Sequence, residues 1–186
     1  MNRKIINIIG YVSMPLLFIF DIVSKYVIEA YLLSNGKDVV IIKNFFNLTL
    51  HYNDGAFSGF LSFLNNDKFP VGTFILLLLS IAGVVGGIIV LIKKRKSLNL
   101  LILIGVFLLI PGAAGNLIDR FLTVIGLQEG VIDFLHFYNL PIIGDFNVFN
   151  FADSYLTISI VIIVAGYIYE EIKNKNNKEN KEVKNG

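Results

Sequence analysis

Residues 69–118 decide the class of this fold, and they read FPVGTFILLLLSIAGVVGGIIVLIKKRKSLNLLILIGVFLLIPGAAGNLI. The stretch contains two uncharged apolar runs, Phe69–Ile92 and Leu98–Ile118, on either side of the basic cluster Lys93–Lys96. As a helix, each run is long enough to cross the roughly 30 Å hydrocarbon core of a bilayer. A helix in a soluble core seldom stays apolar on every face for this length. The stretch therefore predicts two transmembrane helices joined by a short basic link.

Two further apolar runs flank this stretch. Ile5–Leu33 carries three charges, and Phe151–Tyr169 carries one near its start. Of the 186 residues, 55% are hydrophobic and 16% are charged, which excludes a disordered chain and disfavours an ordinary soluble domain. We therefore expect an all-α membrane protein. Its four-helix transmembrane bundle occupies residues 1–170, with spans at about 5–33, 69–92, 98–118 and 151–169.

The basic residues predict the orientation of the bundle. Eleven of the 16 Lys and Arg residues precede the first run, link the second to the third, or follow the fourth. The positive-inside rule places that side in the cytoplasm, so both termini are cytoplasmic and residues 34–68 and 119–150 face outward. The alternative for Lys93–Lys96 is a nucleic-acid or anionic-lipid patch, but a position between two spans favours a topology signal.

The two ends of the chain are read from their composition. The first run resembles a signal peptide in its basic start, but it is too long and no small-x-small cleavage site follows, so we interpret it as a retained span. Residues 171–186 form a polar cytoplasmic tail rich in Lys, Asn and Glu, which predicts disorder.

The outward segments predict a small extracytoplasmic β-structured region. Val39–Lys43 and Phe45–Tyr52 are rich in β-branched and aromatic residues, and the turn-forming Asn53-Asp54-Gly55 follows them. Residues 127–150 also suit an extended unit. The absence of cysteine excludes disulfides, thiol nucleophiles and cysteine-ligated zinc. His51 and His136 receive no catalytic role, and we expect neither a metal nor a cofactor.

Charged residues near membrane depth are the candidates for function, because a carboxylate in lipid costs about 2.5–3.5 kcal/mol even on a lenient scale. Asp21 and Lys25 are four residues apart and share a helix face, and a neutralised structural pair is the more economical interpretation. Asn116 and Asp119 share a face at the end of the third run, with Arg120 beside them. The alternative to a functional role there is helix packing followed by an ion pair of Asp119 and Arg120 at the membrane interface. That alternative explains Asn116 less well, because a buried amide needs several partners.

Asp133 and Asp153 are predicted at the outer mouth of the bundle. Taken alone, Asp153 is explained as a helix N-terminal charge, worth about 0.3–1 kcal/mol. If the two carboxylates converge, they form a pair of like charges that holds one proton. Such a pair suits peptide hydrolysis, because one carboxylate activates water while the protonated one polarises the carbonyl. Their separation of 20 residues leaves the convergence undecided.

Five sequence pieces, in order along the chain, resemble the lipoprotein signal peptidases, also called type II signal peptidases, of aspartic peptidase family A8. The pieces are Asp21-x-x-x-Lys25, Asn53-x-Gly55-Ala56-Phe57, Gly115-Asn116-x-x-Asp119-Arg120, Val131-Ile132-Asp133-Phe134 and Phe149-Asn150-x-Ala152-Asp153-Ser154. The likeness covers roughly residues 5–170. It departs from the family at Ala56, where two alanines are common, at Pro111 before the small residues, and at the additional acid Asp54. None of these departures removes a candidate residue.

The resemblance implies an aspartic endopeptidase of the bacterial cytoplasmic membrane that cuts diacylglyceryl-modified prolipoproteins before the lipidated cysteine. It implies an Asp133/Asp153 dyad facing the extracytoplasmic side, without deciding which aspartate holds the proton. The residues that bind substrate or support the site by the same resemblance are Asn53, Gly55, Asn116, Asp119, Arg120, Asn150, Asp21 and Lys25. The partners are then prolipoprotein and membrane lipid, with no nucleic acid, and a monomer is the expected state.

Two other classes of protein fit intramembrane acids. A transporter or proton-coupled channel needs polar residues along the length of a span, whereas here the acids cluster toward one surface. A non-catalytic assembly factor would use Asp21–Lys25 and Asp119–Arg120 only as ion pairs, and it leaves Asp133 and Asp153 without a role.

Overall fold

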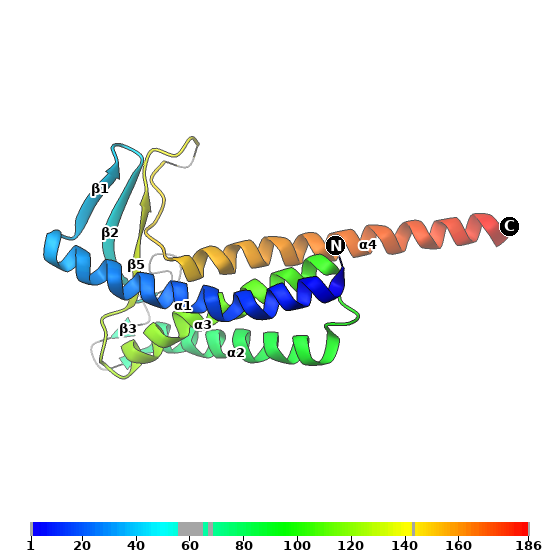
Figure 1. The fold of residues 1–186 in the computed structure, drawn as a ribbon, viewed down its shortest axis with the longest axis horizontal. Helices are drawn as coiled ribbons and strands as arrows, with labels where there is room; N and C mark the ends of the chain where they lie inside the picture. Colours follow the sequence, from blue (N-terminus) through cyan, green and yellow to red (C-terminus); the bar gives the residue numbers. More distant parts are fainter. Residues whose placement is uncertain (1, 56–64, 67–68, 143, 186) are drawn as a thin grey trace.

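Four long helices form the body of the molecule (Figure 1), as the sequence predicts. The computed structural model describes residues 2–55, 65–66, 69–142 and 144–185. All four helices are long and apolar enough to cross a membrane. They are α1 (Arg3–Asn35), α2 (Val71–Lys94), α3 (Leu100–Val124) and α4 (Phe151–Asn185).

Two helix ends differ from the sequence expectation. Helix α3 continues six residues past Ile118, so Asp119 and Arg120 lie inside it rather than at an interface after it. Helix α4 continues through the polar tail, for which the sequence predicts disorder, as far as Asn185. Within that tail, Glu171 and Lys175 stand at the i, i+4 spacing that stabilises an exposed helix, and both side chains are exposed.

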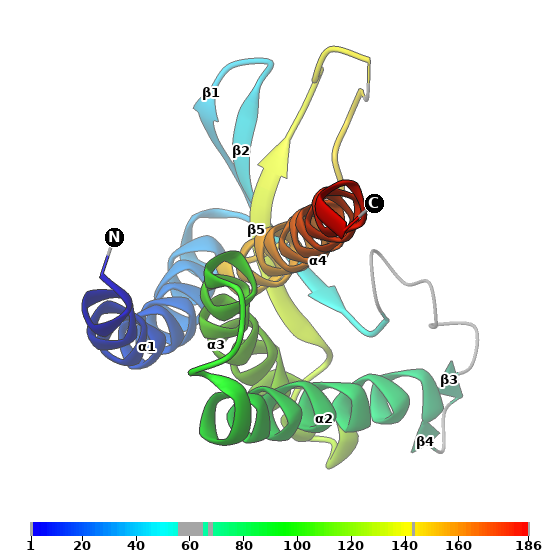
Figure 2. The ribbon, with the colours of Figure 1, turned by 90° about the vertical axis from the view of Figure 1, so that its right-hand side faces the viewer.

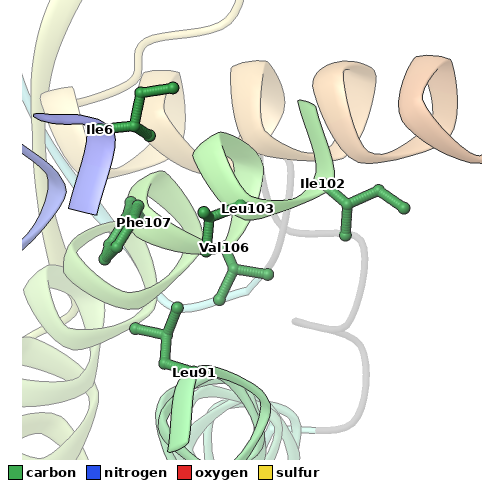
Figure 3. Close-up of a cluster of buried hydrophobic side chains, with 6 residues drawn as sticks. All are labelled: Ile6, Leu91, Ile102, Leu103, Val106 and Phe107. Carbon is green, nitrogen blue, oxygen red and sulfur yellow. The ribbon is translucent and has the colours of Figure 1, made fainter. Parts of the chain in front are cut away.

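Helix α3 is the centre of the bundle and packs against α1, α2 and α4 (Figure 2). Its first half belongs to a buried apolar cluster (Figure 3), which consists of Ile6, Leu91, Ile102, Leu103, Val106 and Phe107. Gly10 of α1 lies directly against the Phe107 ring, where a Cβ atom would overlap it. This close approach of α1 and α3 fits the packing of membrane helices, which depends on small residues more than on a hydrophobic driving force.

A small antiparallel sheet covers one end of the bundle, and the N-terminus and the α2–α3 link lie at the other end (Figure 1). The strand order is β1 (Asp38–Ile42), β2 (Phe46–Asn53), β5 (Val131–Phe137). Strands β1 and β2 confirm the predicted pair of strands, and β5 confirms an extended unit within residues 127–150. A two-stranded pair, β3 (Asn65–Asn66) and β4 (Phe69–Pro70), precedes α2.

The sheet is held on the bundle by α1, which is longer than a span requires. Its 33 residues extend about 50 Å at 1.5 Å per residue. Leu32, near its end, is fully buried in a second apolar cluster with Leu50 of β2 and with Ile132 and Phe134 of β5. Because side chains alternate along a strand, anchoring Ile132 and Phe134 in this cluster sends Asp133 to the opposite face of β5.

Candidate active site

A buried ion triad joins α1 to α3. The Lys25 ammonium lies 3.0 Å from a carboxylate oxygen of Asp21 and 3.0 Å from one of Asp119, and all three side chains are fully buried. The second oxygen of Asp21 accepts a hydrogen bond of 2.7 Å from the Ala152 N–H in the first turn of α4. The triad therefore fixes three helices relative to one another at the level of the candidate site.

The close approach behind this triad depends on Gly115. A Cβ atom at that position would overlap the Asp21 carboxylate and the Ala152 methyl group. The sequence attributes this glycine to helix packing, and the structure agrees.

Lys25 also sets the orientation of Asn116. Its ammonium donates to Asn116 Oδ1 at 2.9 Å, so the amide nitrogen of Asn116 points away from the lysine. That nitrogen donates to Asp153 Oδ1 at 2.7 Å. Because an ammonium has no acceptor, the order of donor and acceptor along this chain of contacts is unambiguous.

Asn150 is oriented in the same way. Its Oδ1 accepts from the Asp153 N–H at 2.9 Å, which leaves its amide nitrogen to donate to Asp133 Oδ1 at 2.6 Å and to Asn116 Oδ1 at 3.1 Å. The other oxygen of Asp133 accepts from Asn53 Nδ2 at 2.9 Å. Two oriented asparagines thus bridge Asp133 to Asp153, and a third binds Asp133 from the sheet.

The two aspartates differ in their access to solvent. Asp133 is fully buried, whereas Asp153 is partly exposed in the first turn of α4. Burial, followed by the charge of Asp153, raises the pKa of Asp133 well above its usual range, although hydrogen bonds from Asn53 and Asn150 act in the opposite direction. This environment favours a pair that carries one proton rather than two full charges.

Asp153 opens onto a groove with a volume of about 410 Å³. Its polar lining includes Asn53, Arg120 and Ser154, and its apolar lining includes Phe146 and Leu156. The groove has room for an extended chain with an apolar side, next to one of the two carboxylates.

Arg120 contributes a cation to this groove. Its guanidinium donates a hydrogen bond to the buried Ser80 hydroxyl of α2. Its Nε lies buried without a hydrogen-bond partner among the residues that the structure describes. The half-buried Arg120 is thus held by its contact with Ser80 on the groove that Asp153 also lines.

The structure brings together nearly all the residues that the sequence singles out. The structure corrects the alternative that pairs Asp119 with the adjacent Arg120. The ion-pair partner of Asp119 is Lys25. Gly55 lies at the site, where its N–H donates to Asn53 Oδ1 at 3.1 Å. Ala56 and Phe57 of the same motif fall outside the described residues.

Two contributors to the site were not found from the sequence. Ser80 and Thr73 are the two hydroxyl residues of the apolar run 69–92, and the sequence does not show that Ser80 does more than bond to its own helix, as it does to the Leu76 carbonyl at 2.9 Å. The Ala152 contact uses a backbone N–H, which carries no residue-type signal. Only the geometry reveals these two groups.

Comparison with known proteins agrees with the motif resemblance. The family described as signal peptidase (SPase) II matches residues 13–169. A lipoprotein signal peptidase of Staphylococcus aureus is 36% identical over 167 residues, covering 89% of each chain.

Solved structures agree as well. A bacterial membrane enzyme determined by the in meso method at 2.3 Å is 30% identical, with a TM-score of 0.67, and the match covers 89% of this chain and 90% of that one. A second, at 1.9 Å, is 31% identical, with a TM-score of 0.61, and the match covers 84% of this chain and 90% of that one. The chain therefore belongs to the signal peptidase II family of membrane-spanning peptidases.

Proposed function

We propose that this chain is an aspartic endopeptidase that removes the signal peptide from diacylglyceryl-modified prolipoproteins, cutting before the lipidated cysteine. The observation that carries the proposal is the bridge of Asn116 and Asn150 between the buried Asp133 and the half-buried Asp153, which lines an open groove. The name of the Staphylococcus aureus relative supplies the substrate class.

The dyad acts on a peptide bond that enters the groove. The ionised carboxylate accepts a proton from water as the water oxygen attacks the carbonyl carbon. The protonated carboxyl donates to the carbonyl oxygen, and a proton reaches the leaving nitrogen as the C–N bond breaks. The single proton belongs to the Asp133/Asp153 pair as a unit.

The surrounding residues give the dyad its geometry. Asn53, Asn116 and Asn150 hold the carboxylates by N–H donation, and Lys25 fixes the amide of Asn116. Arg120 lines the groove as a fixed cation, placed to stabilise negative charge that develops on the carbonyl oxygen. The apolar wall that includes Leu156 and Phe146 suits the lipid and apolar residues of the substrate.

We further propose that both termini are cytoplasmic and that the sheet and the groove face the extracytoplasmic side, with a single chain forming a complete site. The basic N-terminus and the basic α2–α3 link lie at the end of the bundle opposite the sheet (Figure 1). The positive-inside rule assigns that end to the cytoplasm.

The test is cleavage of a purified diacylglyceryl prolipoprotein by the detergent-solubilised wild type, beside Asp153→Asn and the control Asp145→Asn. Asp145 is an exposed carboxylate outside the groove lining. We expect the wild type and the control to cut before the cysteine and Asp153→Asn to be inactive. Undiminished cutting by a folded Asp153→Asn protein would overturn the dyad. Failure of the folded wild type on several lipidated substrates would overturn the activity.

A further inference from the structure

A second groove, unrelated to the dyad, lies between α1, α2 and α3. It has a volume of about 320 Å³. Its lining is apolar and aromatic and comes from all three helices, including Tyr11, Met14 and Phe18 of α1, Ile88 and Leu91 of α2, and Ile110 of α3. Helices α1 and α2 each pack on α3, which leaves this hollow between them.

The groove begins near the basic end of the bundle. Ile88, Leu91 and Ile92 belong to the last two turns of α2, immediately before Lys93. From Tyr11 to Phe18 the α1 wall extends about 10 Å at 1.5 Å per residue. A groove of this length and lining fits one stretch of acyl chain that runs parallel to the helices.

A cation stands at the mouth of this groove. The Arg95 guanidinium donates to the Tyr11 hydroxyl at 2.8 Å and lies 5.9 Å from the centre of the Tyr11 ring. Arg3 braces the same link, because its guanidinium donates to the carbonyl oxygens of Arg95 and Leu98 at 2.6 and 2.7 Å. The position of Arg95 is therefore set by contacts from two sides.

The positive charge at the mouth is not neutralised within the described part of the chain. No carboxylate there lies within 4.0 Å of the side-chain nitrogens of Arg3, Lys4, Lys93, Lys94, Arg95 or Lys96; the ion pairs described are those of Lys25. A guanidinium has five N–H donors, and the described partner of Arg95 is Tyr11 alone. An anion is therefore the complementary group for this end of the groove.

We propose that the α1–α2–α3 groove is a binding site for an anionic phospholipid. One acyl chain lies in the apolar groove against Met14, Phe18 and Ile88, and the phosphate is bound by Arg95 and the neighbouring lysines. The combination of an apolar groove and an unneutralised cation at its mouth selects this ligand over a zwitterionic lipid, whose own ammonium would be repelled. With the topology proposed above, the lipid belongs to the cytoplasmic leaflet.

The test is native mass spectrometry of the intact chain, released from detergent after incubation with equal amounts of phosphatidylglycerol and phosphatidylcholine that have the same acyl chains. We expect the wild type to retain phosphatidylglycerol preferentially. Arg95→Gln should reduce that preference about fivefold, the equivalent of roughly 1 kcal/mol per cation at a lipid surface. Lys173→Gln, which removes an exposed charge on α4, a helix that does not line the groove, should leave it unchanged.

A second pair of variants tests the groove itself. Ile88→Trp fills the hollow without changing charge and should release the bound lipid, whereas Val161→Trp, at an exposed apolar position of α4, should not. Equal retention of the two lipids by the wild type would overturn the proposal. So would equal effects of Arg95→Gln and Lys173→Gln, or undiminished lipid binding by a folded Ile88→Trp protein.

Discussion

The two halves of helix α3 are held in the bundle by different kinds of contact. Its first half is packed by apolar side chains such as Leu103 and Phe107 (Figure 3). Its second half is held by buried polar groups, Asn116 and Asp119, that bind Lys25 and Asp153. In a membrane, apolar packing gains little from leaving lipid, whereas an unpaired buried charge is expensive. The polar half should therefore be both less tolerant of substitution and more specific in geometry.

The largest expected effect is on catalysis at the polar end. Asp133→Asn should lower the rate of prolipoprotein cleavage by about 10³-fold or more, because general acid–base catalysis by one member of the pair is lost. A gel-based rate assay measures the loss, with Asp145→Asn as the control and thermal unfolding as the check of folding. A folded Asp133→Asn protein with near wild-type rates would remove the catalytic distinction between the two halves.

The next effect is on the stability of the polar end. Lys25→Met leaves Asp21 and Asp119 buried without their shared cation, which should cost about 3–5 kcal/mol of unfolding free energy. Unfolding in detergent, monitored by circular dichroism, measures this cost against Lys173→Met, in which an exposed lysine is replaced. If the two variants were equally stable, the triad would not be the structural centre of this end.

The third effect depends on pH and reports on the proton held by the Asp133/Asp153 pair. Because burial raises the pKa of Asp133 above its ordinary value, the native protein holds this proton more tightly than the unfolded chain does. The contribution of the carboxyl to stability is then complete below the ordinary pKa and is lost as the pH rises through the raised one. Between the ordinary and the raised pKa, the free energy of unfolding of the wild type should fall relative to that of Asp133→Asn by about 1.4 kcal/mol per pH unit.

The measurement compares unfolding of the two proteins at a series of pH values, with Asp145→Asn as a third. The difference between Asp145→Asn and the wild type should show no such trend. A wild-type protein that gained stability relative to Asp133→Asn with rising pH would show that hydrogen bonding from Asn53 and Asn150 outweighs burial.

The smallest effect is expected at the apolar end. Leu103→Ala opens a cavity beside Phe107, but it should destabilise by less than the roughly 2–5 kcal/mol seen in soluble cores, because the transfer from water is absent in lipid. Cleavage by the surviving folded protein should keep the wild-type rate. Leu79→Ala, at a position that is 61% exposed, is the control, and a large loss of rate in Leu103→Ala would show that the two halves are coupled.

Individual residues show which contacts of the candidate site can be predicted from the sequence. Asp21 and Lys25 are predictable as a pair because four residues along a helix bring side chains to one face. Their third partner, Asp119, is 94 positions from Lys25, and the sequence offers its neighbour Arg120 as an alternative ion-pair partner. Adjacent residues on a helix point in different directions, so Arg120 instead reaches Ser80 of α2.

In the polar tail, the sequence predicts less order than the structure has. Composition alone predicts disorder over residues 171–186, yet α4 continues as one helix to Asn185. Once a helix has been nucleated in a membrane span, each further residue is fixed in exchange for one added backbone hydrogen bond. Pairs such as Glu171 with Lys175 support that extension.

Hydropathy, spacing and charge are local properties of the chain, so the amino-acid sequence is enough to predict the four long apolar helices, strands β1 and β2, and the candidate acids. Three features are visible only once the chain is folded: Asn116 and Asn150 bridge Asp133 to Asp153, Lys25 orients Asn116, and α1, α2 and α3 leave an apolar groove beside Arg95. These features join residues from different helices and strands. Their relative placement follows from how the whole bundle packs, which no local pattern records.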